Sequence, residues 1–195
     1  MSYKLKKEDT LNIKISVVGL PKVGKTSLIQ KYCKYYGEDK NIYKKIMVFK
    51  NRKLQLLIYD IELKYESYYL YCNSTMFIYV FDVTDNNDFE KNLRNRYKEL
   101  RRYGPFKGKV PRIICGTKAD LPCVVDENII DKFICEKKEH SNVYIEKFKV
   151  SINDNVAIDN LFEAVLPYAI ETQIEVLKDQ NKYVPPPIKK ECVLV

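Results

Sequence analysis

The sequence lacks the features of a membrane-spanning, secreted or zinc-binding protein. No apolar run approaches the ~18 residues that a membrane-spanning helix needs, and the longest, Met76 to Phe81, has the length of a strand. The N-terminus is basic but has no apolar segment of the kind found in signal peptides. A single histidine and six cysteines, none in a C-x-x-C pair, argue against a zinc site. We therefore expect a chain that stays in the cytosol with free thiols.

Glycine is also scarce, with 6 among 195 residues, so a glycine that falls in a motif is informative. A chain of 195 residues suits one domain with a sizeable core. The net charge is +8, but acidic residues are interspersed with the basic ones. The charge fits a solvated surface as well as attraction to an anionic membrane, and we expect no nucleic-acid partner.

Strand and helix patterns alternate along the chain. Strand-like runs cover 12–18, 43–50, 53–60, 76–82, 112–116 and 143–150, and helix-like patterns cover 25–36, 89–103, 126–138 and 155–178. Strands separated by helices predict β-α-β units and a parallel sheet. Asn51-Arg52 reads as a hairpin turn, which adds an antiparallel edge strand. We predict an α/β fold with a six-stranded, mostly parallel sheet and helices on both faces.

A phosphate-binding pattern, G-x-x-x-x-G-K-[ST], follows the first predicted strand. It is formed by Gly19, Leu20, Pro21, Lys22, Val23, Gly24, Lys25 and Thr26, with Ser27 next in the chain. The backbone N–H groups of such a loop form an anion nest, which Gly24 lets a phosphate approach closely. Lys25 brings a cation to the β- and γ-phosphates, and Thr26 offers a hydroxyl to Mg²⁺ at the start of a helix. Because a chance match occurs on the order of once per hundred chains of this length, the loop predicts a bound nucleoside triphosphate.

The base is read by a second motif, Thr117-Lys118-Ala119-Asp120, at the end of a buried strand. The carboxylate of Asp120 can accept hydrogen bonds from the N1–H and the 2-amino group of guanine, a donor pair that adenine lacks. The stem of Lys118 can lie along the base plane. At a strand end downstream of a P-loop, this motif predicts a guanine nucleotide. A small-molecule kinase is the alternative, but an acceptor site and an arginine-rich lid are not apparent.

Together these motifs resemble the Ras superfamily of small GTPases over roughly 12–178. The threonine at 117 and the C-terminal Pro-Pro-Pro-Ile-Lys-Lys-Glu-Cys-Val-Leu-Val resemble the Rho branch, although the interval 120–151 is short for the helix that Rho proteins insert. The resemblance implies a P-loop NTPase fold (a G domain) over 1–179 that binds GTP or GDP with Mg²⁺. It also implies a monomer with effector and regulator proteins as partners. Ser151 and Ile152 begin the segment that stands in place of the family's Ser-Ala-Lys, whose backbone would contact guanine O6.

The groups that sense the γ-phosphate depart from the family pattern. Asp60 matches the aspartate of Asp-x-x-Gly-Gln and could hold Mg²⁺ through water, but Leu63 and Lys64 replace the glycine and glutamine. Residues 28–66 contain no Ser or Thr to serve as the family's switch threonine. Pro21 crowds the γ-phosphate and an incoming arginine finger. We therefore predict a signalling or cytoskeletal regulator with very slow or absent hydrolysis. Two alternatives remain: Glu62 substitutes for the missing group, or the protein is a non-hydrolysing nucleotide-bound scaffold.

The sequence ends in Cys192-Val193-Leu194-Val195, a C-a-a-X pattern that predicts prenylation of Cys192, with an aliphatic end that favours geranylgeranyl. Residues 180–195, with three consecutive prolines, predict a flexible tail. One lipid chain seldom anchors a protein by itself, so a weak basic patch would assist; it consists of Lys182, Lys189 and Lys190. We expect the protein on the cytoplasmic face of the plasma membrane, with a cytosolic pool.

Overall fold

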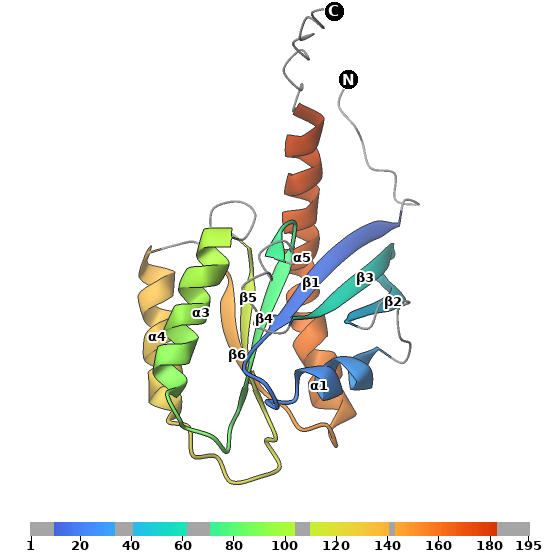
Figure 1. Ribbon diagram of the computed structural model, residues 1–195. Helices are drawn as coiled ribbons and strands as arrows, with labels where there is room; N and C mark the ends of the chain where they lie inside the picture. The colour runs from blue at the N-terminus through green and yellow to red at the C-terminus, as the bar shows by residue number, and fades with distance from the viewer. Residues whose placement is uncertain (1–9, 34–40, 62–70, 104–109, 141–142, 183–195) are drawn as a thin grey trace, which may run out of the picture.

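The computed structural model describes residues 10–33, 41–61, 71–103, 110–140 and 143–182 (Figure 1). Its elements, in chain order, are β1 (Leu11–Val18), α1 (Lys25–Tyr32), β2 (Ile42–Phe49), β3 (Arg52–Ile61), β4 (Met76–Asp82), α3 (Phe89–Tyr103), β5 (Arg112–Thr117), α4 (Glu127–His140), β6 (Ile145–Lys149) and α5 (Asn155–Lys182). The strands form a six-stranded sheet in the order β2-β3-β1-β4-β5-β6. Only β2 runs antiparallel to its neighbour, so the predicted mostly parallel sheet is confirmed.

Two hydrophobic cores lie on opposite faces of this sheet. Successive side chains of a strand point to opposite faces, and on β4 Ile78 enters one core whereas Phe77 enters the other. The first core is covered by α1 and α5, through residues such as Leu28 and Phe162. The second is covered by α3 and α4, through residues such as Phe133. The predicted placement of helices on both faces is therefore confirmed (Figure 1).

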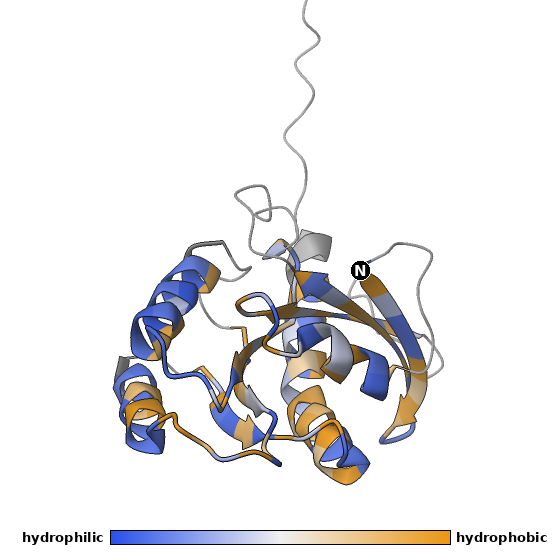
Figure 2. Cartoon of the chain, turned by 60° about the horizontal axis from the view of Figure 1, so that its bottom comes forward, coloured by the Kyte–Doolittle hydropathy of each residue, from blue (hydrophilic) through white to orange (hydrophobic). Residues whose placement is uncertain are grey.

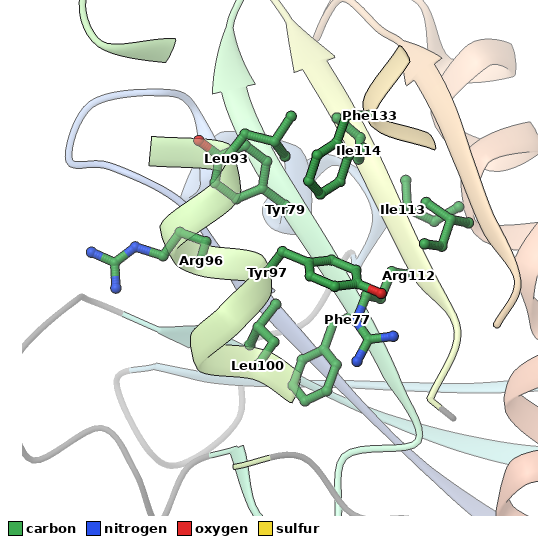
Figure 3. Close-up of a pocket in the computed structure, with 11 residues that line it drawn as sticks. Phe77, Tyr79, Leu93, Arg96, Tyr97, Leu100, Arg112, Ile113, Ile114 and Phe133 are labelled. Carbon is green, nitrogen blue, oxygen red and sulfur yellow. The ribbon is translucent and has the colours of Figure 1, made fainter. Parts of the chain in front are cut away.

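The parallel strands bring their carboxyl ends to one edge of the sheet. Because β1, β3, β4, β5 and β6 all run in the same direction, the loops that follow them gather at this edge. Figure 2 turns the edge forward. Ligands of open α/β sheets bind at such an edge, which makes it the place to look for a functional site. Within the described ranges, no helix is long and apolar enough to cross a bilayer.

The first helix ends at Tyr32, so the predicted extension to Tyr36 is wrong at Cys33, which adopts an extended conformation (φ −99°, ψ 104°). The cause is tertiary. The ring of Tyr32 stacks on Phe162 of α5, with centroids 3.8 Å apart, and Lys45 Nζ of β2 donates a hydrogen bond to the Tyr32 carbonyl at 3.1 Å. That carbonyl is therefore held by a strand instead of by a continuing helix. Residues 34–40 lie outside the described part of the chain.

Other boundaries also differ from the sequence-based expectation. The hairpin turn is formed by Lys50 and Asn51 (φ 47° and 61°), and Arg52 already pairs with Phe49, so the predicted Asn51-Arg52 turn is one residue late. A two-residue hairpin loop with positive φ at both positions matches the twist of the strands. The terminal helix continues through Pro167 to Lys182 instead of ending near 178. The tail from 183 onward lies outside the described residues.

Candidate functional site

The loop between β1 and α1 has the backbone shape of an anion nest. Lys22 (φ 64°) and Gly24 (φ 93°) both lie in the left-handed region, and Gly24 caps the start of α1. Gly19 is required for a different reason, since a Cβ there would lie 2.2 Å from the carbonyl oxygen of Val80 on β4. The loop is therefore pinned against the sheet with the positive end of the α1 dipole beside it.

Lys25 is buried within this loop. Its Nζ donates hydrogen bonds to the carbonyl oxygens of Gly19 at 3.2 Å and Leu20 at 2.9 Å, and only 6% of the residue is exposed. The loop's own backbone thus fixes the position of the ammonium group. A cation held inside an anion nest at a helix start suits a phosphate group.

Thr26 and Asp60 meet beside the loop. Thr26 Oγ1 donates a hydrogen bond to Asp60 Oδ2, at the end of β3. The other carboxylate oxygen, Oδ1, is buried and has no hydrogen-bond partner among the described residues. Hydroxyl and carboxylate oxygens are ligands that Mg²⁺ prefers, directly or through water. The hydroxyl and the carboxylate of this pair therefore fit a magnesium ion, which they would hold directly or through water.

Thr117, at the end of β5, connects the base-reading motif to the phosphate loop. Its Oγ1 lies 2.5 Å from the carbonyl oxygen of Val23 and 2.9 Å from that of Phe81, so its single proton is donated to one of the two. The same atom lies 3.4 Å from the position of a Cβ on Gly24. Sequence reasoning assigned Thr117 to the base motif but missed this link to the P-loop, because the two segments are distant in the chain.

Lys118 has a carboxylate partner that sequence reasoning also missed. Its Nζ forms an ion pair with Asp82 Oδ2, at the end of β4. The other oxygen of Asp82 accepts hydrogen bonds from the Thr84 amide at 2.9 Å and the Thr84 hydroxyl at 2.7 Å. Burial raises the pKa of Asp82, but the hydrogen bonds from Lys118 and Thr84 together lower it below its usual value. The sequence does show one sign of this residue, since Asp82 is a carboxylate at the end of a buried, otherwise apolar strand.

Asp120 lies on the surface beside the loop that follows β6. A hydrogen bond from the Ser151 side chain, followed by bonds from its own backbone amide and from Asn153, lowers the pKa of Asp120 below its usual value. The two loops are also joined by the Ala119 amide, which donates to the Val150 carbonyl at 3.2 Å. A carboxylate that stays ionised is the acceptor that a guanine edge requires. Ile152, 48% exposed, follows Ser151 at the same edge.

The described structure thus brings the sequence-predicted binding residues to one edge of the sheet (Figure 2). They are Gly19, Pro21, Lys22, Val23, Gly24, Lys25, Thr26 and Ser27 on the loop and first turn of α1, Asp60 near the end of β3, Thr117, Lys118 and Asp120 at and after the end of β5, and Ser151 and Ile152 after β6. Leu63, Lys64 and Cys192 lie outside the described residues. Within the described ranges no group of three or more His, Cys, Asp and Glu could hold a metal by itself.

Known proteins resemble this chain over most of its length. It is 26% identical over 179 residues to Ras-related protein Rab-7b of Bos taurus, covering 86% of this chain and 87% of that protein. It is 30% identical over 175 residues to Ras-related protein Rab-21 of Bos taurus, covering 84% and 75%. A third relative, Ras-like protein family member 11A-like of Danio rerio, is 28% identical over 128 residues, covering 56% and 50%.

A protein-family model described as the Ras family matches residues 14–171. The matched segment begins in β1 and ends within α5, so it includes the sheet and every loop of the site. The chain therefore belongs to the Ras family of small GTP-binding proteins.

Proposed function

We propose that the carboxyl edge of the sheet binds GTP or GDP together with Mg²⁺. The observation that carries the proposal is the contact between Thr26 and the buried carboxylate of Asp60, beside the loop that encloses Lys25. Lys25 and the N–H groups of the loop would hold the phosphates. Thr26 and Asp60 would hold the magnesium ion, which neutralises phosphate charge when bound.

The guanine base would lie against the loops after β5 and β6. Asp120 would accept hydrogen bonds from the N1–H and the 2-amino group, and the stem of Lys118 would cover the base plane. The backbone at Ser151 and Ile152 would face guanine O6. The lowered pKa of Asp120 supports this role, because the carboxylate must be ionised to accept both bonds.

Identification of the nucleotide that purifies with the protein tests the proposal. The protein is denatured, and the released nucleotide is separated by ion-exchange chromatography against GDP, GTP, ADP and ATP standards. We expect GDP or GTP at close to one equivalent, lost on treatment with EDTA. Retention of ADP or ATP, and binding of added ATP in preference to GTP, would contradict a guanine site and favour the small-molecule kinase.

Hydrolysis of the bound GTP is proposed to be very slow or absent. Leu63 and Lys64 replace the family's glycine and water-orienting glutamine, and residues 28–66 contain no Ser or Thr. Pro21 is exposed on the phosphate loop, where its ring would crowd the γ-phosphate. A single-turnover assay with GTP-loaded protein should release little phosphate over hours. Turnover at the rate of an ordinary small GTPase would contradict this prediction.

The same substitutions support the second candidate, a nucleotide-bound scaffold that does not switch. Without a threonine to clamp the γ-phosphate, the two nucleotide states would differ little. Amide hydrogen exchange of the protein with GDP and with a non-hydrolysable GTP analogue distinguishes the two. A regulator that switches should show altered protection in the interval between Lys25 and Asp60, whereas a scaffold should give the same pattern in both states.

The branch within the superfamily is a separate question. The expectation of a Rho-type protein, acting in signalling or cytoskeletal control with effector and regulator partners, rests on Thr117 and on the C-terminal tail. Two of the three relatives above bear Rab names, and none bears a Rho name. The similarity therefore gives no support to the Rho assignment, which stays a prediction.

Membrane attachment is proposed through prenylation of Cys192, with a cytosolic pool and the cytoplasmic face of the plasma membrane as the location. The support is the C-a-a-X pattern together with the nearby lysines. A fluorescent protein fused to the N-terminus leaves this end free. Cys192→Ser should move the fusion to the cytosol, whereas Cys135→Ser, at an exposed cysteine of α4, should not. Membrane localisation that survives Cys192→Ser would contradict the anchor.

A further inference from the structure

A carboxylate outside the predicted site, that of Asp82, forms an ion pair with Lys118 of the site. Asp82 ends β4, and its backbone pairs in register with Thr117 at the end of β5, directly before Lys118. The amide of Val83 also donates to the Thr117 carbonyl at 3.2 Å. The ion pair between Asp82 and Lys118 thus joins the ends of two adjacent, hydrogen-bonded strands.

The carboxylate of Asp82 is itself held in place. One oxygen accepts both the amide and the hydroxyl of Thr84, at 2.9 Å and 2.7 Å, which leaves the other oxygen for Lys118. The Asp82 side chain is 13% exposed, whereas that of Lys118 is 40% exposed. A largely buried anion that accepts two other hydrogen bonds therefore pairs with the end of a lysine whose side chain is partly exposed.

A lysine needs such a partner to cover a base. Its side chain has many rotamers, and ordering it costs conformational entropy at the moment of binding. A group ordered in advance removes that cost from the binding step. Lys118 also has a left-handed backbone (φ 59°), which sets the direction in which its stem leaves the strand end.

We infer that Asp82 is a positioning residue, which holds Lys118 by its ammonium group so that the lysine stem is already in place for guanine. This inference rests on the proposed guanine site. The bonds that hold the Asp82 carboxylate and the Lys118 ammonium group come from groups of this chain alone, so they can orient the lysine before a ligand binds.

A double-mutant cycle on the full chain tests the inference. The variants are Asp82→Asn, Lys118→Met and the pair, with release of a fluorescent GDP analogue measured after addition of excess GDP. Asparagine keeps the shape of Asp82 and an acceptor for Thr84, but it removes the charge that holds Lys118. Asp82→Asn should speed release about fivefold to tenfold in the presence of Lys118. In the Lys118→Met background it should leave the rate unchanged.

Asp85→Asn is the matched control. Asp85 lies on the same loop and is exposed, and its side chain accepts a local bond from the Asn87 amide, which asparagine can also accept. Its release rate should equal that of the wild type. Melting temperatures of all variants are measured with the analogue bound. They separate loss of positioning from loss of folding, because a loss of stability caused by Asp82→Asn would be the same in the wild type and in Lys118→Met.

The outcomes separate this inference from the function on which it rests. Equal acceleration by Asp82→Asn with and without Lys118 would show that Asp82 acts by another route and would overturn the inference. No acceleration in the wild-type background would also overturn it, while leaving the guanine site intact. A wild-type protein that does not retain the analogue would overturn both.

Discussion

Thr26 and Asp60, separated by 34 positions in the sequence, are joined by a hydrogen bond from the hydroxyl of Thr26 to Oδ2 of Asp60, while Oδ1 of the same carboxylate is buried. This contact places the first turn of α1 against the end of β3. It also leaves an anionic oxygen turned away from water at the edge where the phosphate loop lies. Burial of such an oxygen is costly unless a cation or a donor compensates it.

The first prediction concerns this pair. Asp60→Asn removes the charge that a magnesium ion needs, so release of a fluorescent GDP analogue in the presence of Mg²⁺ should accelerate about tenfold or more. Chelation by EDTA should speed release from the wild type but add little to the variant. Asp159→Asn, at an exposed position of α5, should behave as the wild type. A variant that retains full sensitivity to EDTA would exclude Asp60 from the metal site.

The periodicity of the sequence was sufficient to predict the six strands of the sheet, to within a few residues at their ends. The runs at 76–82 and 112–116 are buried on both faces and mostly apolar, because helices cover both sides of a parallel sheet. The end of α1 could not be predicted, since it is set by Phe162 and Lys45, which lie far away in the sequence. Local propensity carries no information about such partners.

The candidate site also contains some residues that the sequence could predict and others that it could not. The phosphate loop and Asp120 belong to short contiguous motifs, which a single sequence displays. Asp82 has no motif of its own, and its role depends on a lysine 36 positions away that the sheet brings beside it. The contact between Thr117 and Val23 spans 94 positions. Both became visible only when β4, β5 and the P-loop were placed together.

The second prediction concerns the base. Asp120→Asn replaces two acceptor oxygens with one acceptor and one donor, so it loses the match to guanine N1–H and the 2-amino group and gains a match to xanthine O2. We expect the affinity for GDP to fall at least about 100-fold and that for xanthosine diphosphate to rise. Competition with a fluorescent GDP analogue measures both.

Asp126→Asn is the control for this substitution. Asp126 lies at the start of α4 and accepts a hydrogen bond from the Asn128 amide at 2.9 Å, which asparagine can also accept. Its nucleotide preference should be that of the wild type. Unchanged selectivity in Asp120→Asn would show that another group reads the base.

The third prediction concerns hydrolysis. The double substitution Leu63→Gly and Lys64→Gln restores the family's water-orienting pattern after Asp60. Because loss of a water-orienting residue or an arginine finger can cost ~10³–10⁵ in rate, partial recovery should raise the single-turnover rate at least about tenfold. Lys53→Gln, at an exposed position of β3, is a lysine-to-glutamine control that should leave the rate unchanged. A double variant as slow as the wild type would place the block elsewhere, with Pro21 the next position to change.

The last prediction concerns acid stability. Burial raises the pKa of Asp82, but hydrogen bonds from Lys118 and Thr84 lower it to below its usual 3.8. A folded-state pKa below the unfolded value means that the carboxylate stabilises the fold fully above that unfolded value. The contribution is then lost as the pH falls through the folded-state pKa. Since Lys118 is 40% exposed, solvent screening limits the pair to about 0.5–1 kcal/mol.

Urea unfolding of the nucleotide-free protein measures this contribution. The free energy of unfolding of the wild type should exceed that of Asp82→Asn by the same amount at pH 7 and pH 5, since Asp82 is ionised in both states at these values. The difference should shrink at pH 3, where the unfolded chain protonates the carboxyl group and folding must release that proton. Asp85→Asn, at an exposed position of the same loop, is the control. A difference that is as large at pH 3 as at pH 7 would mean that the lost stability comes from packing, and that the ion pair with Lys118 contributes little to the fold.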